Sequence, residues 1–116
     1  MKKRVRLTRQ SDFQRVLGGE RVFAGRTLVA FAKPGEGEAT RVGVAVSRRV
    51  RGAVDRNRIR RRLREAARRA QAGDWSTAGL GRRYDVVLIG RPAALEAPWG
   101  AVEADVSAAL ARVVRT

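Results

Sequence analysis

The chain has 116 residues, the usual size of one folded domain, so we expect a single domain over residues 1–116 that opens with a short basic arm at residues 1–7. The formal net charge of +15 favours a polyanionic partner, either a nucleic acid or an anionic membrane surface. The absence of Cys and His excludes disulfides, zinc sites built from those residues and the side chains best suited to proton transfer near neutral pH.

Two further features of the composition narrow the class of protein. No apolar run approaches the roughly 18 residues that a transmembrane helix needs, and no signal peptide is evident, so we expect a cytoplasmic protein without a membrane partner. The 11 acidic residues are scattered and form no spacing typical of a carboxylate-bound metal. We therefore expect neither catalytic nor metal-binding residues in this chain.

The residues after the basic arm predict a short helix and then three strands. The helix is expected from about residue 9 to Leu17, with Thr8 as its N-cap and Gly18-Gly19 as its stop. The strand signals lie at residues 21–23, 27–33 and 41–47. Residues 34–40 contain two Gly and one Pro and are the best candidate in the chain for a hairpin loop.

The strand at 41–47 alternates large and small side chains. One face carries Val42, Val44 and Val46, and the other carries Gly43, Ala45 and Ser47. The small face allows another group to approach the sheet closely. That group is a helix by default, or a ligand if the face is open.

The most strongly charged stretch runs from Arg48 to Arg69. It holds eleven arginines against Asp55 and Glu65, and so contributes +9 of the net charge of +15. A helix is expected from about Arg56, with Asp55 as its N-cap. At 3.6 residues per turn, its apolar stripe consists of Ile59, Leu63, Ala66, Ala67 and Ala70. The opposite side carries Asn57, Arg60, Arg61, Arg64 and Arg68, and one flank carries Arg58, Arg62 and Arg69 beside Glu65.

Two interpretations of this basic helix are open. It could be an ordinary solvated face, and the strong preference for Arg over Lys could reflect GC-rich coding. However, like charges three and four residues apart repel each other, so such a density of arginine is unusual unless a polyanion relieves the repulsion. Arg also offers a planar fork for phosphate. The density of arginine and the scarcity of acidic partners favour RNA or DNA over a solvated face.

The last third of the chain predicts a loop, a strand and a helix. Residues 73–83 form a Gly-rich loop without the context of a phosphate-binding motif. The apolar run Tyr84–Gly90 predicts a strand covered on both faces. Pro98 suits the first turn of a final helix over about 98–114. The expected core stripe of that helix is Trp99, Val102, Val106, Ala109, Leu110 and Val113. The full order is then α-β-β-β-α-β-α.

Taken together, these residues resemble the signature of the protein subunit of bacterial ribonuclease P. The signature comprises Val46-Ser47-Arg48-Arg49, the turn Gly52-Ala53-Val54, the segment Arg56-Asn57-Arg58-Ile59-Arg60-Arg61, and Arg64. Similar residues also stand at Lys2-Lys3-Arg4-Val5-Arg6-Leu7, Asp12-Phe13 and Gly90-Arg91-Pro92-Ala93. The resemblance therefore covers nearly the whole chain. A lone Arg-Asn-Arg would be weak, whereas this combined spacing is specific.

The resemblance implies a fold and a function. The fold is an α/β (α+β) two-layer sandwich like a domain of a small-subunit ribosomal protein, with one mixed sheet of about four strands. The crossover through the basic helix is left-handed in the family, and we adopt that hand, although parallel neighbouring strands are usually joined by right-handed crossovers. The function is that of a ribonucleoprotein endonuclease, a hydrolase of tRNA processing, which removes the 5′ leader of precursor tRNA.

The resemblance also implies partners and site residues. In the family the RNA subunit holds the catalytic Mg²⁺ ions, so the implied partners are that catalytic RNA and precursor tRNA, with no DNA. Residues that would contact the RNA subunit are Arg48, Arg49, Arg56, Asn57, Arg58, Arg60, Arg61, Arg64 and, on the same exposed side, Arg68. Residues of the leader-binding cleft, between the first helix and the sheet, would be Phe13, Leu17, Val29 and Phe31.

Three positions differ from the family pattern, and other classes of function remain as alternatives. Leu17 and Phe31 stand where relatives often carry Phe and Tyr, which would weaken stacking, and Arg62 stands where an apolar residue is common. Without the resemblance, the sequence favours Phe13 and Phe31 as ordinary core residues. The main alternative function is a structural rRNA-binding protein of the ribosomal type. A nucleoid-type DNA binder and a self-sufficient nuclease are weaker alternatives.

Overall fold

The computed structural model describes residues 10–35, 40–71 and 84–115. Its elements are α1 (Gln10–Leu17), β1 (Glu20–Ala24), β2 (Leu28–Pro34), β3 (Arg41–Val46), α2 (Ala53–Gln71), β4 (Tyr84–Gly90), the 3₁₀ helix η1 (Pro92–Leu95) and α3 (Trp99–Arg115). The predicted order of helices and strands is confirmed, with η1 as an addition. The basic arm, the Thr8 cap and the loop at 73–83 lie outside the described residues.

The four strands form one mixed sheet in the order β1-β2-β4-β3. β2 is antiparallel to both of its neighbours, whereas β3 and β4 are parallel and are joined through α2. The prediction of a hairpin loop at 34–40 is wrong, because β4 lies between β2 and β3. The Gly and Pro residues of 34–40 indicate only that the chain changes direction there. They do not indicate that β2 and β3 each pair with β4, which comes much later in the chain.

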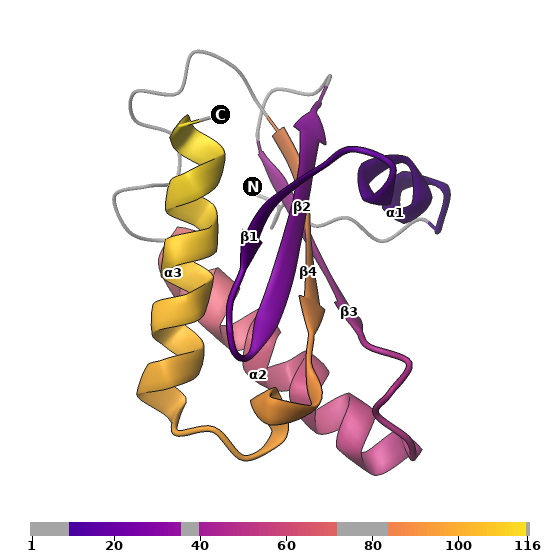
Figure 1. Ribbon diagram of the computed structural model, residues 1–116, viewed down its shortest axis with the longest axis vertical. Coiled ribbons are helices and arrows are strands. Elements are labelled where there is room, and N and C mark those ends of the chain that lie inside the picture. Colours follow the sequence, from indigo (N-terminus) through magenta and orange to yellow (C-terminus); the bar gives the residue numbers. More distant parts are fainter. Residues whose placement is uncertain (1–9, 36–39, 72–83, 116) are drawn as a thin grey trace, which may run out of the picture.

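The helices cover both faces of this sheet (Figure 1). α2 and α3 lie together on one face, and the short helix α1 lies on the other. The larger core cluster lies on the α2/α3 side, where Ile59, Leu63 and Leu88 are fully buried. A smaller cluster on the α1 side centres on Val16 and Val87. β4 is therefore covered on both faces, as its apolar run predicted.

The packing of α2 and α3 follows the predicted apolar stripes. The predicted α3 stripe is confirmed, since Val102, Val106 and Val113 are fully buried and Trp99 is half-buried. α2 lies close to the end of β4 because residue 90 is a glycine. A Cβ atom there would lie 2.5 Å from Cγ2 of Ile59 and 3.0 Å from Cδ1 of Leu63. Gly90 thus allows the two apolar anchors of α2 to touch the strand backbone.

Candidate RNA interface

α2 is attached to the protein along its apolar stripe. Ile59 and Leu63 are 0% exposed, and Ala66 and Ala67 are 3% exposed, as the periodicity predicted. The helix also contacts β3, η1 and α3. Its outer side is therefore presented in a fixed orientation, because four buried side chains over about three turns prevent the helix from rotating.

The predicted N-cap of α2 is wrong. The helix begins at Ala53, so Asp55 is its third residue rather than its cap. The residue before the helix is Gly52, with a φ of 91°, and its carbonyl accepts the first helical bond from the N–H of Arg56 at 3.1 Å. A positive φ favours glycine at this position. Asp55 still stabilises the helix, because a carboxylate in the first turn complements the helix dipole.

A group of exposed arginines lies on the outer side of α2 and on the loop that leads into it. Arg58, Arg61 and Arg64 are exposed on the helix, and Arg48, Arg49 and Arg51 are exposed on the loop. All of these except Arg51 are predicted RNA-binding positions. We call these six residues the arginine face. The loop that carries three of them leads directly into α2.

Three other predicted RNA-binding residues interact with their own helix. Arg60 Nη1 donates a hydrogen bond of 2.9 Å to Oδ1 of Asn57. Arg68 forms an ion pair with Glu65, with 2.6 Å between Nη2 and Oε2. Hydrogen bonds from Arg68 and then Arg69 lower the pKa of Glu65 to about 2. The Arg68 charge is thus partly balanced within the protein.

Arg56 has an intramolecular role that the sequence pattern did not indicate. Its Nη1 donates to the carbonyls of Ser47 at 2.9 Å and Val50 at 3.0 Å, and its Nη2 donates to the carbonyl of Val46 at 3.2 Å. These bonds close the turn between β3 and α2. Arg56 therefore holds in place the loop that carries Arg48 and Arg49, in addition to its predicted contact with RNA.

Arg62 likewise faces its own chain. Its guanidinium donates to the carbonyls of Ala94, Leu95 and Ala97, and its Nη2 lies 2.6 Å from the last of these. It also lies 6.0 Å from the centre of the Trp99 ring, and Arg69 lies 5.6 Å from the same ring. The half-buried guanidinium is stabilised because these carbonyls accept its hydrogen bonds and the Trp99 ring lies against its face.

The residues of the predicted leader cleft come from α1 and β2. Phe13 and Phe31 pack against the cluster of Val16 and Val87, and Leu17 is 39% exposed. Phe13 and Phe31 are therefore partly core, as the alternative interpretation held, yet neither is fully buried. On this face of the sheet, α1 lies over one end of the strands (Figure 1).

The open part of this face is a pocket of about 560 Å³. Its apolar floor is formed by Val29, Phe31 and Ile89, and three arginines, Arg26, Arg49 and Arg91, stand around it. Phe13 and Leu17 are not among its described lining residues. On the small face of β3, Ala45 packs against the α1-side cluster and Ser47 lines the pocket, and a ligand on this face stays a prediction.

Arg26 and Arg91 are pocket residues that the sequence reasoning did not select. Arg26 precedes β2 and Arg91 follows β4, and these ends meet because Leu28 pairs with Gly90 in the antiparallel register. The N–H of Arg91 donates to the carbonyl of Thr27 at 2.8 Å, which brings the two segments together. The pairing of β2 with β4, which brings Arg26 and Arg91 together, is not evident from the sequence. In the sequence, Arg91 is part of the resemblance without an assigned role, and Arg26 belongs to no motif.

Two other classes of site find no support in the described part of the chain. In residues 10–35, 40–71 and 84–115, no group of three acidic side chains could hold a metal ion. Within the same ranges, no helix has the length and apolar character to cross a membrane.

The fold and the surface define an α+β protein that holds an arginine-rich helix by its apolar side and leaves a cation-lined pocket on the opposite face of the sheet. The family profile described as ribonuclease P matches residues 1–114. The chain is 42% identical over 113 residues to the ribonuclease P protein component of Paramagnetospirillum magneticum, which covers 93% of this chain and 81% of that one. It is 42% identical over 91 residues to the ribonuclease P protein component of Dehalococcoides mccartyi, and this alignment covers 78% of this chain and 69% of the relative.

Solved structures show the same fold. The ribonuclease P protein of Staphylococcus aureus matches with a TM-score of 0.72 at 24% identity, over 96% of both chains. That of Thermotoga maritima matches with a TM-score of 0.73 at 22% identity, over 94% of this chain and 97% of the other. This chain belongs to the ribonuclease P protein family. The membership implies processing of the tRNA 5′ end together with an RNA subunit.

Proposed function

We propose that the arginine face of α2 docks this protein onto the catalytic RNA subunit, and that the cleft beside α1 receives the 5′ leader of precursor tRNA. The protein then assists the endonucleolytic cut that gives the mature 5′ end. The RNA subunit and its Mg²⁺ ions carry the chemistry, and the protein alone is inactive. The cytoplasm is the compartment in which such an assembly would work.

One observation carries the docking part of this proposal. Ile59 and Leu63 are fully buried, whereas Arg58, Arg61 and Arg64 on the same helix are exposed. The helix therefore cannot turn its charges inward without losing its anchors. Fixed guanidinium groups offset phosphate repulsion and form forked hydrogen bonds to phosphate oxygens. A rigid cationic rod suits a folded RNA, whose phosphates are themselves fixed in space.

The pocket supports the leader part of the proposal. Single-stranded nucleic acids bind where cationic grooves track the backbone and aromatic faces stack on bases. Arg26, Arg49 and Arg91 supply the charge, and Phe31 supplies an aromatic surface at the pocket floor. Arg49 belongs both to the arginine face and to the pocket. A leader in the pocket would thus lie beside the docked RNA subunit.

The assignment of the chemistry to the RNA subunit rests on the side chains that this chain has. His and Cys are absent from the sequence, so the groups that commonly move protons near neutral pH are missing. The described residues offer no cluster of acidic side chains that could hold a catalytic metal ion. The protein acts instead by positioning substrate and reducing repulsion between phosphates. Both effects lower the Mg²⁺ concentration that the RNA needs.

The decisive experiment is cleavage of precursor tRNA by the cognate RNA subunit at low Mg²⁺, with and without this protein. We expect efficient cleavage only when the protein is present, and no cleavage by the protein without RNA. Equal rates with and without the protein would overturn the proposal. Cleavage by the RNA-free protein would revive the self-sufficient nuclease.

The leader role needs a separate measurement, because a structural rRNA-binding protein would also bind RNA through α2. The affinity of the reconstituted complex is measured for precursor tRNA and for mature tRNA. We expect tighter binding of the precursor. Equal affinities would contradict leader binding and favour the structural class, and a preference for duplex DNA in competition would favour a nucleoid protein.

A further inference from the structure

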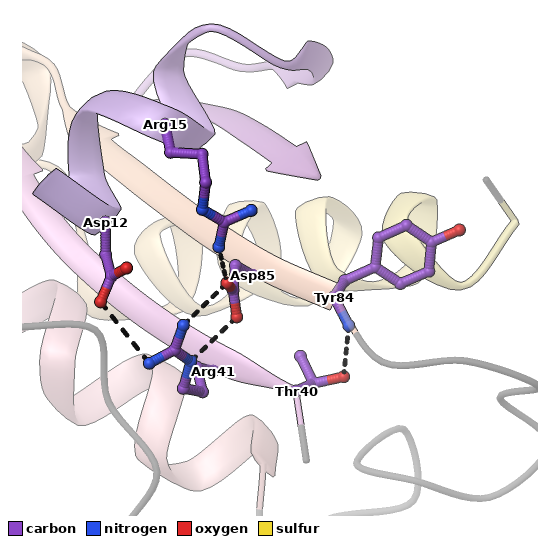
Figure 2. Close-up of polar contacts among 6 residues, drawn as sticks. All are labelled: Asp12, Arg15, Thr40, Arg41, Tyr84 and Asp85. Carbon is purple, nitrogen blue, oxygen red and sulfur yellow. Dashed lines mark hydrogen bonds and ion pairs between the residues drawn. The ribbon is translucent and has the colours of Figure 1, made fainter. Parts of the chain in front are cut away.

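A buried carboxylate on the α1 side of the sheet connects three elements (Figure 2). Asp85 lies on β4, and its side chain is 2% exposed. Arg41, its register partner on β3, donates from Nε to Oδ1 at 3.0 Å and from Nη2 to Oδ2 at 2.9 Å. Arg15 of α1 donates from Nη2 to the same Oδ2. Asp85 is therefore the point at which α1 is tied to the two parallel strands.

A second polar link joins the same elements. Nη1 of Arg41 lies 3.6 Å from Oδ2 of Asp12, which also belongs to α1 (Figure 2). The hydrogen bond to Asp85 is the main reason why the pKa of Arg41 is raised above its ordinary value. Arg41 is thus held by β4 on one side and holds α1 on the other. If Asp85 lost its charge, both links between α1 and the sheet would be affected.

α1 depends on these links more than a longer helix would. It has eight residues, which is too short to be stable in isolation. Of its side chains, Val16 is fully buried and Phe13 is partly buried against the sheet. One full apolar anchor can hold a helix down but cannot set the direction of its axis. The ion pairs at Asp12 and Arg15 supply the further attachment points that fix that direction.

In the proposed function, α1 forms one side of the leader cleft, next to the pocket on the sheet face. Phe13 and Leu17 stand on α1, and Val29 and Phe31 stand on the sheet. Asp85 lies on the same face of β4 as Ile89, which forms part of the pocket floor, but is outside the pocket's described lining. It can therefore influence the cleft without touching a ligand there.

We propose that Asp85 is a positioning residue for leader binding: through Arg15 and Arg41 it holds α1 at the angle that places Phe13 and Leu17 opposite Val29 and Phe31. This inference rests on the proposed function, since it assumes that the leader occupies this cleft. It adds a residue that acts on the leader from outside the binding surface. Docking of the RNA subunit through α2, on the other face of the sheet, does not depend on it.

The test uses the reconstituted holoenzyme and the ratio of its affinities for precursor and mature tRNA. Asp85→Asn keeps the shape of the side chain and removes its charge. We expect this variant to lower the ratio by about tenfold, the size of one lost base-stacking contact. Its affinity for the RNA subunit should stay within about twofold of the wild type, because the arginine face is unchanged.

A second pair of variants separates positioning from direct contact. Arg15→Met removes the α1 partner while leaving Asp85 paired with Arg41, so this variant is expected to fold even if Asp85→Asn does not. Positioning predicts that both Arg15→Met and Asp85→Asn lower the ratio and that Arg15→Lys largely restores it. If Arg15 instead touched the leader directly, Asp85→Asn would leave Arg15 free to bind, and only Arg15→Met would lower the ratio. That outcome would overturn the proposal.

Glu103→Gln serves as the matched control for charge. It removes one negative charge from an exposed ion pair on α3, far from α1, and should leave the ratio unchanged. An equal loss in Glu103→Gln would show that net charge, not the position of α1, sets the ratio, and would overturn the proposal. A wild-type ratio of one would overturn leader binding and this inference together. A wild-type ratio above one that Arg15→Met leaves unchanged would overturn only the positioning role.

Discussion

The two helices that carry the proposed binding residues are attached to the sheet in opposite ways. α2 has 19 residues and is held by an apolar stripe in which Ile59 and Leu63 are completely buried. α1 has eight residues and is held by Val16 together with the ion pairs of Asp85 and Asp12. Attachment through buried apolar side chains is insensitive to salt and to changes of surface charge. The position of α1 on the sheet depends instead on particular ion pairs. The proposed docking surface therefore depends on buried apolar contacts, whereas the proposed leader cleft depends on the ion pairs that hold α1.

The largest expected effect concerns the arginine face of α2. If it makes six to ten phosphate contacts, affinity for the RNA subunit should fall by roughly 10³–10⁵ between about 50 and 200 mM salt. The fall arises because each neutralised phosphate releases condensed counterions. Titrations over a series of salt concentrations measure the slope. A nearly flat response would remove α2 as the electrostatic docking surface.

Truncation of a buried apolar side chain should reduce the free energy of unfolding more on α2 than on α1. Leu63→Ala should cost about 2–5 kcal/mol of unfolding free energy, because it leaves a cavity in the main core. Val16→Ala should cost less, since it removes fewer buried atoms. Urea unfolding measures both. Val54→Ala is the control, because Val54 is 78% exposed and its truncation should change stability by less than about 0.5 kcal/mol. A larger loss for Val16→Ala than for Leu63→Ala would reverse the comparison.

Removal of arginines from the outer side of α2 should weaken RNA binding without unfolding the protein. Arg61→Ala and Arg64→Ala each should lower the slope of log affinity against log salt by about 0.7–0.9 if the side chain contacts one phosphate. Arg21→Ala, on the exposed surface of edge strand β1, is the matched control and should change the slope little. Circular dichroism checks the fold. Loss of folding in either α2 variant would show that the faces of the helix were assigned wrongly.

The smallest effect concerns the ion pair on the outer side of α2. The pKa of Glu65 is about 2 in the folded protein against an ordinary value of 4.5, so the pair with Arg68 stabilises the fold above pH 4.5. That stabilisation is lost as the pH falls from 4.5 through about 2. Because the pair is exposed, the gain is small. The difference in urea midpoint between wild type and Glu65→Gln should therefore shrink over that interval, and a constant difference would contradict the pairing.

The sequence by itself determined the features that depend on local periodicity. The spacing of Ile59 and Leu63 separated the apolar stripe of α2 from its charged side, and the run Tyr84–Gly90 indicated a strand covered on both faces. Such patterns are readable because a helix or strand repeats its direction every 3.6 or 2 residues. The lack of His and Cys is a property of composition alone, and the expectation drawn from it, that this chain has no catalytic residues, stays a prediction.

Only the tertiary structure decided which distant residues meet. β4 pairs between β2 and β3, and this pairing brings Arg26 and Arg91 to one pocket. It also places Asp85 beside Arg41 and beneath Arg15, 44 and 70 residues away in the chain. The same holds for Arg56 and Arg62, whose guanidinium groups bind carbonyls of their own chain. Arginines on one helix share a residue type and a spacing, yet only the packing of neighbouring elements determines which of them face solvent and which satisfy a buried carbonyl.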